Sequence, residues 1–425
     1  MGELFRLSGK QTVKSTNRTR YFLAAVFALW LLAGCGSGSS GDGGNPTMPP
    51  PPGATVIRVP QDFATISAAV AAANAGDTIR VGRGTYSETG TLNISIDLSI
   101  ESEFVDTGDP GDVANTVITG AGGNDLFIIG GGASFRIEGL TIENCGKPIT
   151  IDVGHGIIRS NVVRDNSNDA ISFEGDSSGV AEYNTITNSG DDAIDIDGSR
   201  GPYTIRGNHV SGTDDDGMEF RMLDAYLVGG TIQYEVYENI IQNTAGDGIQ
   251  LIDYPTDTED RREINIHHNL IENATFAGIG TMPDEMSQRA DLGETYPNIG
   301  FAERVFVTNN TIVNSDNGIA GGDSFIVLNN IVANNRIGIT NVDADSRLDY
   351  TMLFNNALSG VPPEVQGANI LFDDPQLDNE GLLQNSSPAI DAGASAYSWQ
   401  GQTVLSITVF DGSAPDLGWA ENDAT

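Results

Sequence analysis

Acidic side chains recur at one place in consecutive segments of this chain, and their spacing could support metal chemistry. The segment with Asp191, Asp192 and Asp195 is followed by one with acids at the same three places. If like positions stack about 4.8 Å apart, as neighbouring strands do, their carboxylates repel unless a cation neutralises them. Ca²⁺ suits such a place because it takes roughly six to eight hard oxygen ligands. The sequence predicts a Ca²⁺ site, with a solvated acidic ladder as the alternative; the candidate ligands are Asp169, Asp191, Asp192, Asp195, Asp215, Asp216 and Glu219.

A bound cation beside a base would suit β-elimination from a uronate. The cation neutralises the carboxylate and stabilises the enolate, and the base removes the proton at C5. Arg221 lies on the outward phase of the Glu219 strand, beside the position of Asp197 in the preceding segment, so a structural ion pair is its alternative role. His268 lies at the turn before Asn269. The candidate bases are Arg221, Arg261, Arg262 and His268.

The segments that must position these groups repeat one pattern. An Asn is followed eight residues later by an Asp, then by a small and an apolar residue, as in Asn184 and Asp192. Apolar and polar residues alternate within each unit, which indicates strands, and no unit has room for a helix. Short strands stacked coil on coil predict a parallel β-helix with one Asn per coil in a ladder. The repeated Asn positions are Asn161, Asn184, Asn208, Asn239, Asn269, Asn310 and Asn330.

Three insertions interrupt the regular coils after the same strand, at about 223–234, 254–262 and 283–304. Because the coils are in register, we expect the insertions to pile into one wall beside the acidic cluster. Aromatic rings and guanidinium groups suit sugar rings and carboxylates, and loops on a rigid scaffold often carry function. The alternative is that the loops only cover the core. The candidate substrate-binding residues are Tyr226, Tyr254, Arg289 and Tyr296, and the same wall holds Tyr234, Arg261, Arg262 and Arg304.

The first 34 residues predict a targeting segment and not part of the fold. A basic stretch precedes the apolar run from Tyr21 to Leu32, which is too short to span a membrane as a helix. The run ends in Leu-Ala-Gly-Cys, which resembles a bacterial lipobox and implies cleavage before Cys35 and its acylation. Gly36 after the cysteine implies the outer membrane. Residues 35–54 are rich in Gly, Ser and Pro and predict a tether.

The charge of the remaining chain restricts its partners. Removing residues 1–34 takes one acid and five bases from the 58 and 21 of the whole chain, which leaves a formal charge of −41. Such a charge argues against nucleic acid, and against a bare polyanion unless cations mediate. With Cys35 acylated, Cys145 has no intrachain disulfide partner and is expected to be buried. We expect a monomer that touches the membrane only through its lipid.

The ends of the region 55–425 resemble those of known solenoids. Phe63, Ile66, Ala69, Val70 and Ala73 share one helical face before Gly76. This stretch resembles the N-terminal cap of pectin-lyase-like β-helices, where a helix covers the open first coil. The end, from Asp-Pro-Gln at 374–376 to Pro-Asp-Leu-Gly at 415–418, resembles the closing segment of bacterial surface β-helix proteins. The resemblance implies an all-β, right-handed parallel β-helix with an N-terminal capping α-helix.

Two enzyme families resemble the acidic cluster. Pectate lyases of polysaccharide lyase family nine bind Ca²⁺ through an Asp on one coil and Asp-Asp-x-x-Asp on the next, as at Asp169 and 191–195 here; their base is a Lys, and the only Lys after the leader is Lys147, upstream. Polygalacturonases have a similar Gly-Asp-Asp, but their following Gly-His-Gly and Arg-x-Lys motifs are missing. The resemblance implies a surface protein that binds and cleaves a uronate polysaccharide with Ca²⁺. A non-catalytic glycan-binding or adhesin-type β-helix and a polygalacturonase-like hydrolase are the alternatives.

Overall fold

The computed structural model describes most of the chain after the proposed tether. It describes residues 53–198, 200–223, 231–254, 262–283, 296–298, 300–301, 303–359 and 361–422. Cys35, Tyr226, Arg261 and Arg289 lie outside the described residues, so the expectations placed on them stay predictions.

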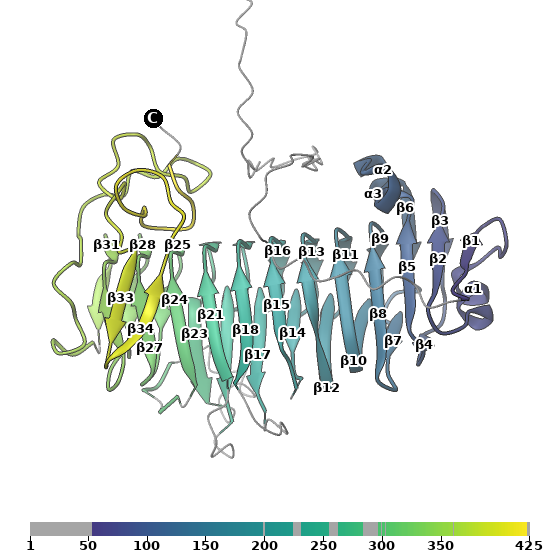
Figure 1. Cartoon of the computed structure of the whole chain (residues 1–425), viewed down its shortest axis with the longest axis horizontal. Coiled ribbons are helices and arrows are strands. Elements are labelled where there is room, and N and C mark those ends of the chain that lie inside the picture. The colour runs from purple at the N-terminus through teal and green to yellow at the C-terminus, as the bar shows by residue number, and fades with distance from the viewer. Residues whose placement is uncertain are drawn as a thin grey trace, which may run out of the picture.

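Three parallel ladders of short strands form a rod, as predicted (Figure 1). The strands belong to a 21-stranded and an 11-stranded sheet, and the larger sheet holds two ladders because β10 and β12 run through two sides of their coils. In the four coils that begin with β11, β13, β16 and β19, an Asn turn leads into the first ladder, an Asp turn leads into the second ladder, and the third ladder returns to the next Asn turn.

The three ladders have the following bounds. The first ladder comprises β3 (Gly84–Ser87), β6 (Thr116–Thr119), β9 (Thr141–Glu143), β11 (Val162–Asn166), β13 (Thr185–Ser189), β16 (His209–Thr213), β19 (Ile240–Gln242), β22 (Leu270–Glu272), β25 (Thr311–Val313), β28 (Ile331–Ala333) and β31 (Met352–Phe354). The second ladder comprises β4 (Leu92–Ile94), β7 (Phe127–Ile129), the starts of β10 (Ile149–Arg159) and β12 (Ile171–Glu182), β14 (Ile194–Ile196), β17 (Met218–Met222), β20 (Ile249–Asp253), β23 (Ala277–Pro283), β26 (Asn317–Ala320), β29 (Ile337–Thr340) and β32 (Ala357–Ser359). The third ladder comprises β1 (Val56–Val59), β2 (Asp77–Val81), β5 (Leu98–Ser102), β8 (Ala133–Glu138), the ends of β10 and β12, β15 (Tyr203–Arg206), β18 (Ile232–Tyr237), β21 (Arg262–His267), β24 (Arg304–Thr308), β27 (Phe325–Leu328) and β30 (Arg347–Asp349).

Apolar side chains of successive coils stack inside the rod. On the second ladder Ile171 pairs with Ile194, and Ile194 with Met218. All three side chains are fully buried and belong to one continuous core. Because side chains alternate across a strand, the residues between them point away from this core. The predicted alternation of each unit is confirmed.

The predicted Asn ladder is present at the turn before the first ladder. The side-chain amide of Asn184 donates to Oδ1 of Asn208 at 3.0 Å and to the Ile158 carbonyl at 2.9 Å. The same bonds recur from coil to coil, and each of these Asn residues is buried. Each amide therefore satisfies backbone and side-chain groups of neighbouring coils that no water could reach.

A short helix covers the N-terminal end of the rod. Helix α1 (Ile66–Ala72) buries Ile66 and Ala69 against the first coils, and the Thr65 side chain caps it by accepting from the Ala68 backbone N–H. The helix ends at Ala72, before the expected stop at Gly76. Two helices that the sequence did not predict, α2 (Phe104–Thr107) and α3 (Pro110–Asn115), lie between β5 and β6. Among the described residues, no helix has the length and apolar character needed to cross a bilayer.

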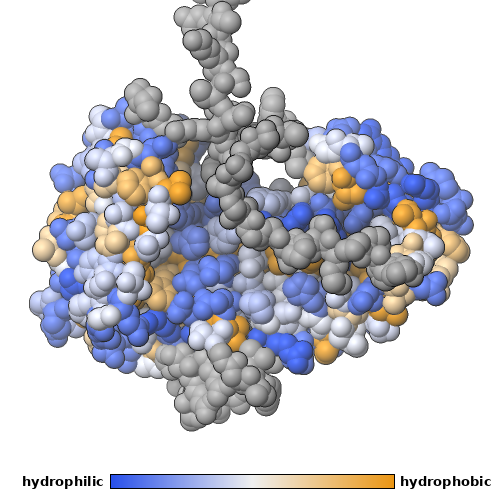
Figure 2. Space-filling view, viewed as in Figure 1, coloured by the Kyte–Doolittle hydropathy of each residue, from blue (hydrophilic) through white to orange (hydrophobic). Residues whose placement is uncertain are grey.

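The C-terminal segment folds back along the outside of the last coils (Figure 1). Leu383, Ala389 and Leu417 pack on the outward face of the first ladder. An antiparallel hairpin, β33 (Ala396–Trp399) and β34 (Gln402–Ser406), packs on the outward face of the third ladder around Ile326 and Leu328. Figure 2 shows the same face filled in, with hydrophilic residues over much of the surface. The segment shields outward apolar side chains that would otherwise face water.

Candidate metal and carbohydrate site

The acidic cluster lies on the second ladder, at the Asp turn and the strand that follows it. Asp195 pairs with Ser172 on one side and with Glu219 on the other. Both carboxylates point away from the apolar core, as the alternation predicted, but only 4% of Asp195 and 6% of Glu219 is exposed. An outward direction on the strand therefore does not mean exposure to solvent at these two positions.

The Asp turns form a ladder of their own. Asp192 Oδ1 accepts the backbone N–H of Asp216 at 2.8 Å, and Asp169 Oδ1 accepts the N–H of Asp192 at 3.3 Å. Asp216 and Asp247 accept N–H groups of the next coil in the same way. One oxygen of each carboxylate thus holds the turn above it, which leaves the other oxygen for a different partner.

Two groups of carboxylates come close enough to share a cation. Single oxygens of Asp192, Asp195 and Glu219 all lie within 4.8 Å of one another, and so do oxygens of Asp191, Asp192 and Asp215. We call the first group the inner triad. Asp192 belongs to both groups, and Oδ1 of the buried Asp195 has no hydrogen-bond partner. Hard, closely spaced oxygens with an unsatisfied member are the donor set that Ca²⁺ takes.

Two cations lie beside the cluster. Lys147 Nζ lies 2.9 Å from Asp169 Oδ2 and 2.9 Å from Glu174 Oε1, so the structure brings the lysine of the preceding coil to the site. Arg221 contacts Asp197 at 3.0 Å and Glu219 at 2.6 Å, as the sequence predicted for Asp197. Sequence reasoning set Lys147 aside as upstream; its spacing of one coil from Asp169 was the signal that could have placed it.

Both cations stay protonated in this arrangement. Burial lowers the pKa of Lys147, but its hydrogen bonds and charge attraction to Asp169 and Glu174 outweigh burial and raise the pKa. Burial likewise lowers the pKa of Arg221, but the charges of Glu219 and Asp197 outweigh burial and raise the pKa above its ordinary value. Neither side chain can act as a general base while these ion pairs hold, so Arg221 is not a base in this state.

The carboxyls respond in the opposite direction. Burial, reinforced by neighbouring acids, raises the pKa of Asp191 to about 6. Burial also raises the pKa of Glu219 to about 8, against the attraction of Arg221. For Asp192 and Asp195, burial and then nearby carboxylates raise the pKa well above the ordinary value. The cluster is therefore a place where negative charge is costly unless a cation neutralises it.

This cost predicts a pH dependence of stability. A carboxyl whose pKa is higher in the folded protein than in the unfolded chain contributes stability below its unfolded pKa and loses it as pH rises through the folded pKa. The pKa of about 6 for Asp191 and about 8 for Glu219 place the loss between about pH 4 and pH 8. In chelator, we expect the melting temperature of the full chain to fall by a few degrees from about pH 5 to pH 8. Differential scanning calorimetry measures it.

Two single substitutions show whether the pH dependence of the melting temperature arises in the acidic cluster. Glu219→Gln should flatten the fall, whereas Glu380→Gln, at an exposed position of the C-terminal segment, should leave it unchanged. A melting temperature that rises steadily over this range in the wild type would contradict the assignment.

Two of the predicted substrate-binding residues, Tyr254 and Tyr296, lie among the described residues. Tyr254, just after β20, lies close enough to Arg221 to contribute to its electrostatics. The Tyr296 hydroxyl donates to Asp247 Oδ1 at the end of the Asp ladder. A Cβ on Gly280 would lie 2.5 Å from the Tyr296 ring, so glycine there leaves room for the tyrosine. Both tyrosines therefore border the acidic site.

Three other expectations are wrong. Tyr234 packs fully buried against Tyr203 inside the rod and is not part of a wall. Arg262 is 2% exposed and pairs with the buried Glu303 at 3.1 Å, so it cannot meet a substrate as a base. Burial lowers the pKa of His268 to about 3, and His268 lies at the Asn turn, across the coil from the Asp turns.

A comparison with protein-family models agrees with this fold. A family described as the right-handed beta helix region matches residues 124–283. Similar solved structures include pectate lyase Pel9A, with 16% identity over 84% of this chain and 91% of that chain and a TM-score of 0.45. The A-module of mannuronan C-5 epimerase AlgE6 from Azotobacter vinelandii has 11% identity over 73% and 93% of the two chains and a TM-score of 0.43. A PL6 family polysaccharide lyase from Pseudopedobacter saltans has 12% identity over 78% and 97% and a TM-score of 0.43. The comparison with curated proteins gave no match.

Proposed function

We propose that this right-handed parallel β-helix, pectin-lyase-like in fold, binds an acidic polysaccharide at the acidic cluster with Ca²⁺ and cleaves it by β-elimination. The observation that carries the proposal is the inner triad of Asp192, Asp195 and Glu219, which is buried and closely spaced and in which only Glu219 contacts a described cationic side chain, Arg221. The unpartnered Oδ1 of Asp195 gives an ion a ready ligand.

The donor set fits Ca²⁺ better than a smaller cation. The oxygens belong to a chain of carboxylates on adjacent coils, and Ca²⁺ accepts more oxygens at looser geometry than Mg²⁺ does. A Ca²⁺ ion held there would neutralise the uronate carboxylate and stabilise the enolate that forms when C5 loses its proton. The inner triad would supply the first ligands, and Asp191 and Asp215 would supply the second group that shares Asp192. Asp169 is already held by Lys147 and serves the turn ladder.

The chain's own residues would then handle the proton. Arg221 stays a cation between Asp197 and Glu219, where it can attract the uronate carboxylate. Tyr254 lies within electrostatic reach of Arg221, which places a phenol oxygen near the proposed position of the uronate carboxylate. In the proposed step Tyr254 takes the C5 proton, the C4–O bond to the leaving sugar breaks, and its electrons stay with that oxygen while a C4–C5 double bond forms. This proposal gives Tyr254 the role of base and Arg221 that of a substrate-binding residue, whereas the sequence predicted Arg221 as a base and Tyr254 as a substrate-binding residue.

A non-catalytic glycan-binding function is the second candidate. It is favoured by one observation, that the basic groups described next to the cluster, Lys147 and Arg221, are both locked in ion pairs that raise their pKa. In that case Ca²⁺ would bridge the cluster to polymer carboxylates without turnover. Acylation of Cys35, anchoring at the outer membrane and a monomeric state remain proposals from the sequence.

The deciding experiment incubates the full chain with polygalacturonate, alginate and a neutral glucan, with Ca²⁺ or with chelator. We expect ultraviolet absorbance of an unsaturated uronate product from one of the two acidic polymers, only with Ca²⁺, because elimination needs the neutralised carboxylate. Binding without product would favour the non-catalytic function. New reducing ends without the absorbance would favour hydrolysis, for which Asp191, with its pKa raised to about 6, is a suitable acid.

A further inference from the structure

Arg304 differs from every other basic residue that the structure describes. Within the described ranges, each other arginine and Lys147 has a carboxylate oxygen within 4.0 Å, whereas Arg304 has none. The chain after the leader carries 57 acids to 16 bases, so carboxylate partners are abundant. Glu263 is even the direct neighbour of Arg304 across the ladder, but the two make no ion pair. A guanidinium without a carboxylate partner is unexpected in so acidic a chain.

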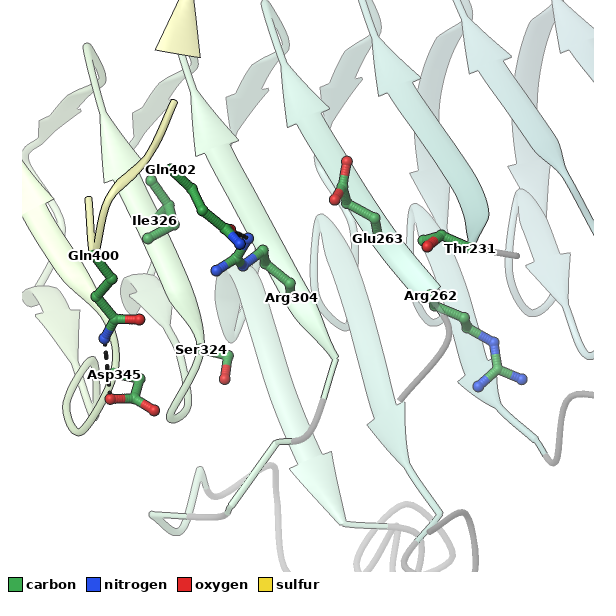
Figure 3. Close-up of a pocket in the computed structure, with 9 residues that line it drawn as sticks. All are labelled: Thr231, Arg262, Glu263, Arg304, Ser324, Ile326, Asp345, Gln400 and Gln402. Carbon is green, nitrogen blue, oxygen red and sulfur yellow. Dashed lines mark hydrogen bonds between the residues drawn. The ribbon is translucent and has the colours of Figure 1, made fainter. Parts of the chain in front are cut away.

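Arg304 instead lines a polar cavity of about 370 Å³ on the outward face of the third ladder (Figure 3). Its floor comes from β21, β24 and β27, with Glu263, Arg304 and Ser324 on adjacent strands or turns. The tip of the β33–β34 hairpin forms one side. There Gln402 Oε1 accepts from Arg304 Nη1 at 2.6 Å, and Gln400 Nε2 donates to Asp345 Oδ1 at 3.1 Å. The hairpin and the ladder are both well packed, so the cavity has a fixed outline.

The chemistry of the lining suits one sugar residue with a carboxylate. Arg304 is held by a neutral amide at one nitrogen, and its remaining N–H groups match a carboxylate in the fork geometry that guanidinium provides. Glu263 and Asp345 add acceptors, and Ser324 and the two glutamines add both donors and acceptors, for sugar hydroxyls. The guanidinium carbon of Arg304 also lies 5.8 Å from the centre of the Phe306 ring, a contact that helps to orient the guanidinium.

We propose that this cavity is a second carbohydrate subsite that binds a uronate carboxylate through Arg304. It is separate from the acidic cluster, because the cluster occupies the second ladder and the cavity occupies the third ladder of the same rod. It needs no Ca²⁺, since the charge that receives the uronate is the arginine's own. The subsite rests on the proposed function only for the class of ligand, and it does not require cleavage.

Calorimetric titration of the full chain with trigalacturonate in chelator tests the subsite. Arg304→Gln should weaken binding about tenfold, as expected for loss of a charge-assisted pair. Gln402→Glu should weaken it at least as much, because a carboxylate fixed on Arg304 would occupy the guanidinium without removing it. Arg336→Gln is the matched control, since Arg336 is an exposed arginine paired with Asp316, and it should leave binding unchanged. Added salt should weaken binding by the wild type.

The outcomes separate this subsite from the proposed function. The same Arg304 effect should persist when Asp192 and Asp195 are both replaced by asparagine, a change that disables the acidic cluster. No binding of trigalacturonate in chelator, or equal binding by Arg304→Gln and wild type, would overturn the subsite while leaving Ca²⁺-dependent cleavage intact. Equal affinity for maltotriose, a neutral trimer, would also overturn it, because recognition would then not depend on the carboxylate.

Discussion

Replacing both Asp192 and Asp195 with asparagine should abolish the rise in melting temperature that Ca²⁺ gives the wild-type chain. An ion held only by the folded stack stabilises the protein by mass action, about 2.7 kcal/mol when its concentration is a hundred times the dissociation constant. For a protein of this size that corresponds to a shift of several degrees. The pair contributes two of the three carboxylates of the inner triad, so their loss should remove nearly all of the shift. Scanning calorimetry with and without millimolar Ca²⁺ measures it.

The same double variant should gain stability in chelator. Burial raises the pKa of both carboxyls, which means that their charged forms are unfavourable in the folded protein without a cation. Neutral amides avoid this repulsion, so the melting temperature without Ca²⁺ should rise as the Ca²⁺ response disappears. Opposite signs in the two conditions distinguish loss of a metal site from general damage.

Cleavage should disappear together with the Ca²⁺ response. We expect a fall of at least about a hundredfold in the rate of unsaturated product formation, the scale of losing one preorganised electrostatic contact in a transition state. The control replaces Asp373 with asparagine and Glu380 with glutamine, two exposed acids of the C-terminal segment, and should change neither property. If the wild type shows the Ca²⁺ shift without cleavage, the protein is a binding module. If the wild type binds no Ca²⁺ at millimolar concentration, the elimination mechanism fails.

Replacing Ile194 with aspartate should be among the most destabilising single changes in the chain. Its side chain is fully buried between Ile171 and Met218 of the adjoining coils. An unpaired carboxylate there has no partner inside the apolar stack, so we expect a loss of roughly 4 kcal/mol or more in the free energy of unfolding. Each coil touches only its neighbours, so the damage should spread along the rod as early local opening.

A matched surface variant gives the reference for this loss. Thr187→Asp introduces the same charge on an outward position of β13, directly beside Arg164. We expect it to change the free energy of unfolding by less than about 1 kcal/mol. Denaturant titration followed by circular dichroism compares the two. Similar stability of both variants would show that Ile194 does not lie in the stack.

The sequence repeat made the fold predictable, whereas the insertions hid the positions and the burial of several site residues. The Asn and Asp turns recur in sequence, so their ladders and the alternation around Ile194 follow from spacing alone. Alternation gives the direction in which a side chain points but not its exposure, so the burial of the outward Asp195 and Glu219 could not be predicted from the sequence. Tyr234 follows an insertion, and the length of an insertion does not reveal where the strand phase resumes.

Contacts between unlike coils were equally hidden. Lys147 precedes the repeat that defines the cluster, and only stacking brings its ammonium group to Asp169. Helices α2 and α3 fill a long connection whose composition carries no helical period. Arg304 has a neutral partner, Gln402, which lies on a hairpin nearly a hundred residues later in the chain. Such features arise from tertiary packing, which periodicity does not encode.

The way the C-terminal segment closes the rod has a mechanical consequence. Hydrogen bonds between coils run along the rod axis, so tension between the two ends of the chain would load one coil at a time and peel coils off in sequence. The segment, however, reaches back past the last coils: Asn329 exchanges two bonds with the backbone of Ala394, and Asn309 donates to the Asp416 carbonyl. Tension applied at the C-terminus must therefore detach the C-terminal segment from these coils before it acts on β31. The C-terminal segment therefore stabilises the last coils against tension. Unfolding under load would begin either with release of this segment or at the end of the rod covered by α1.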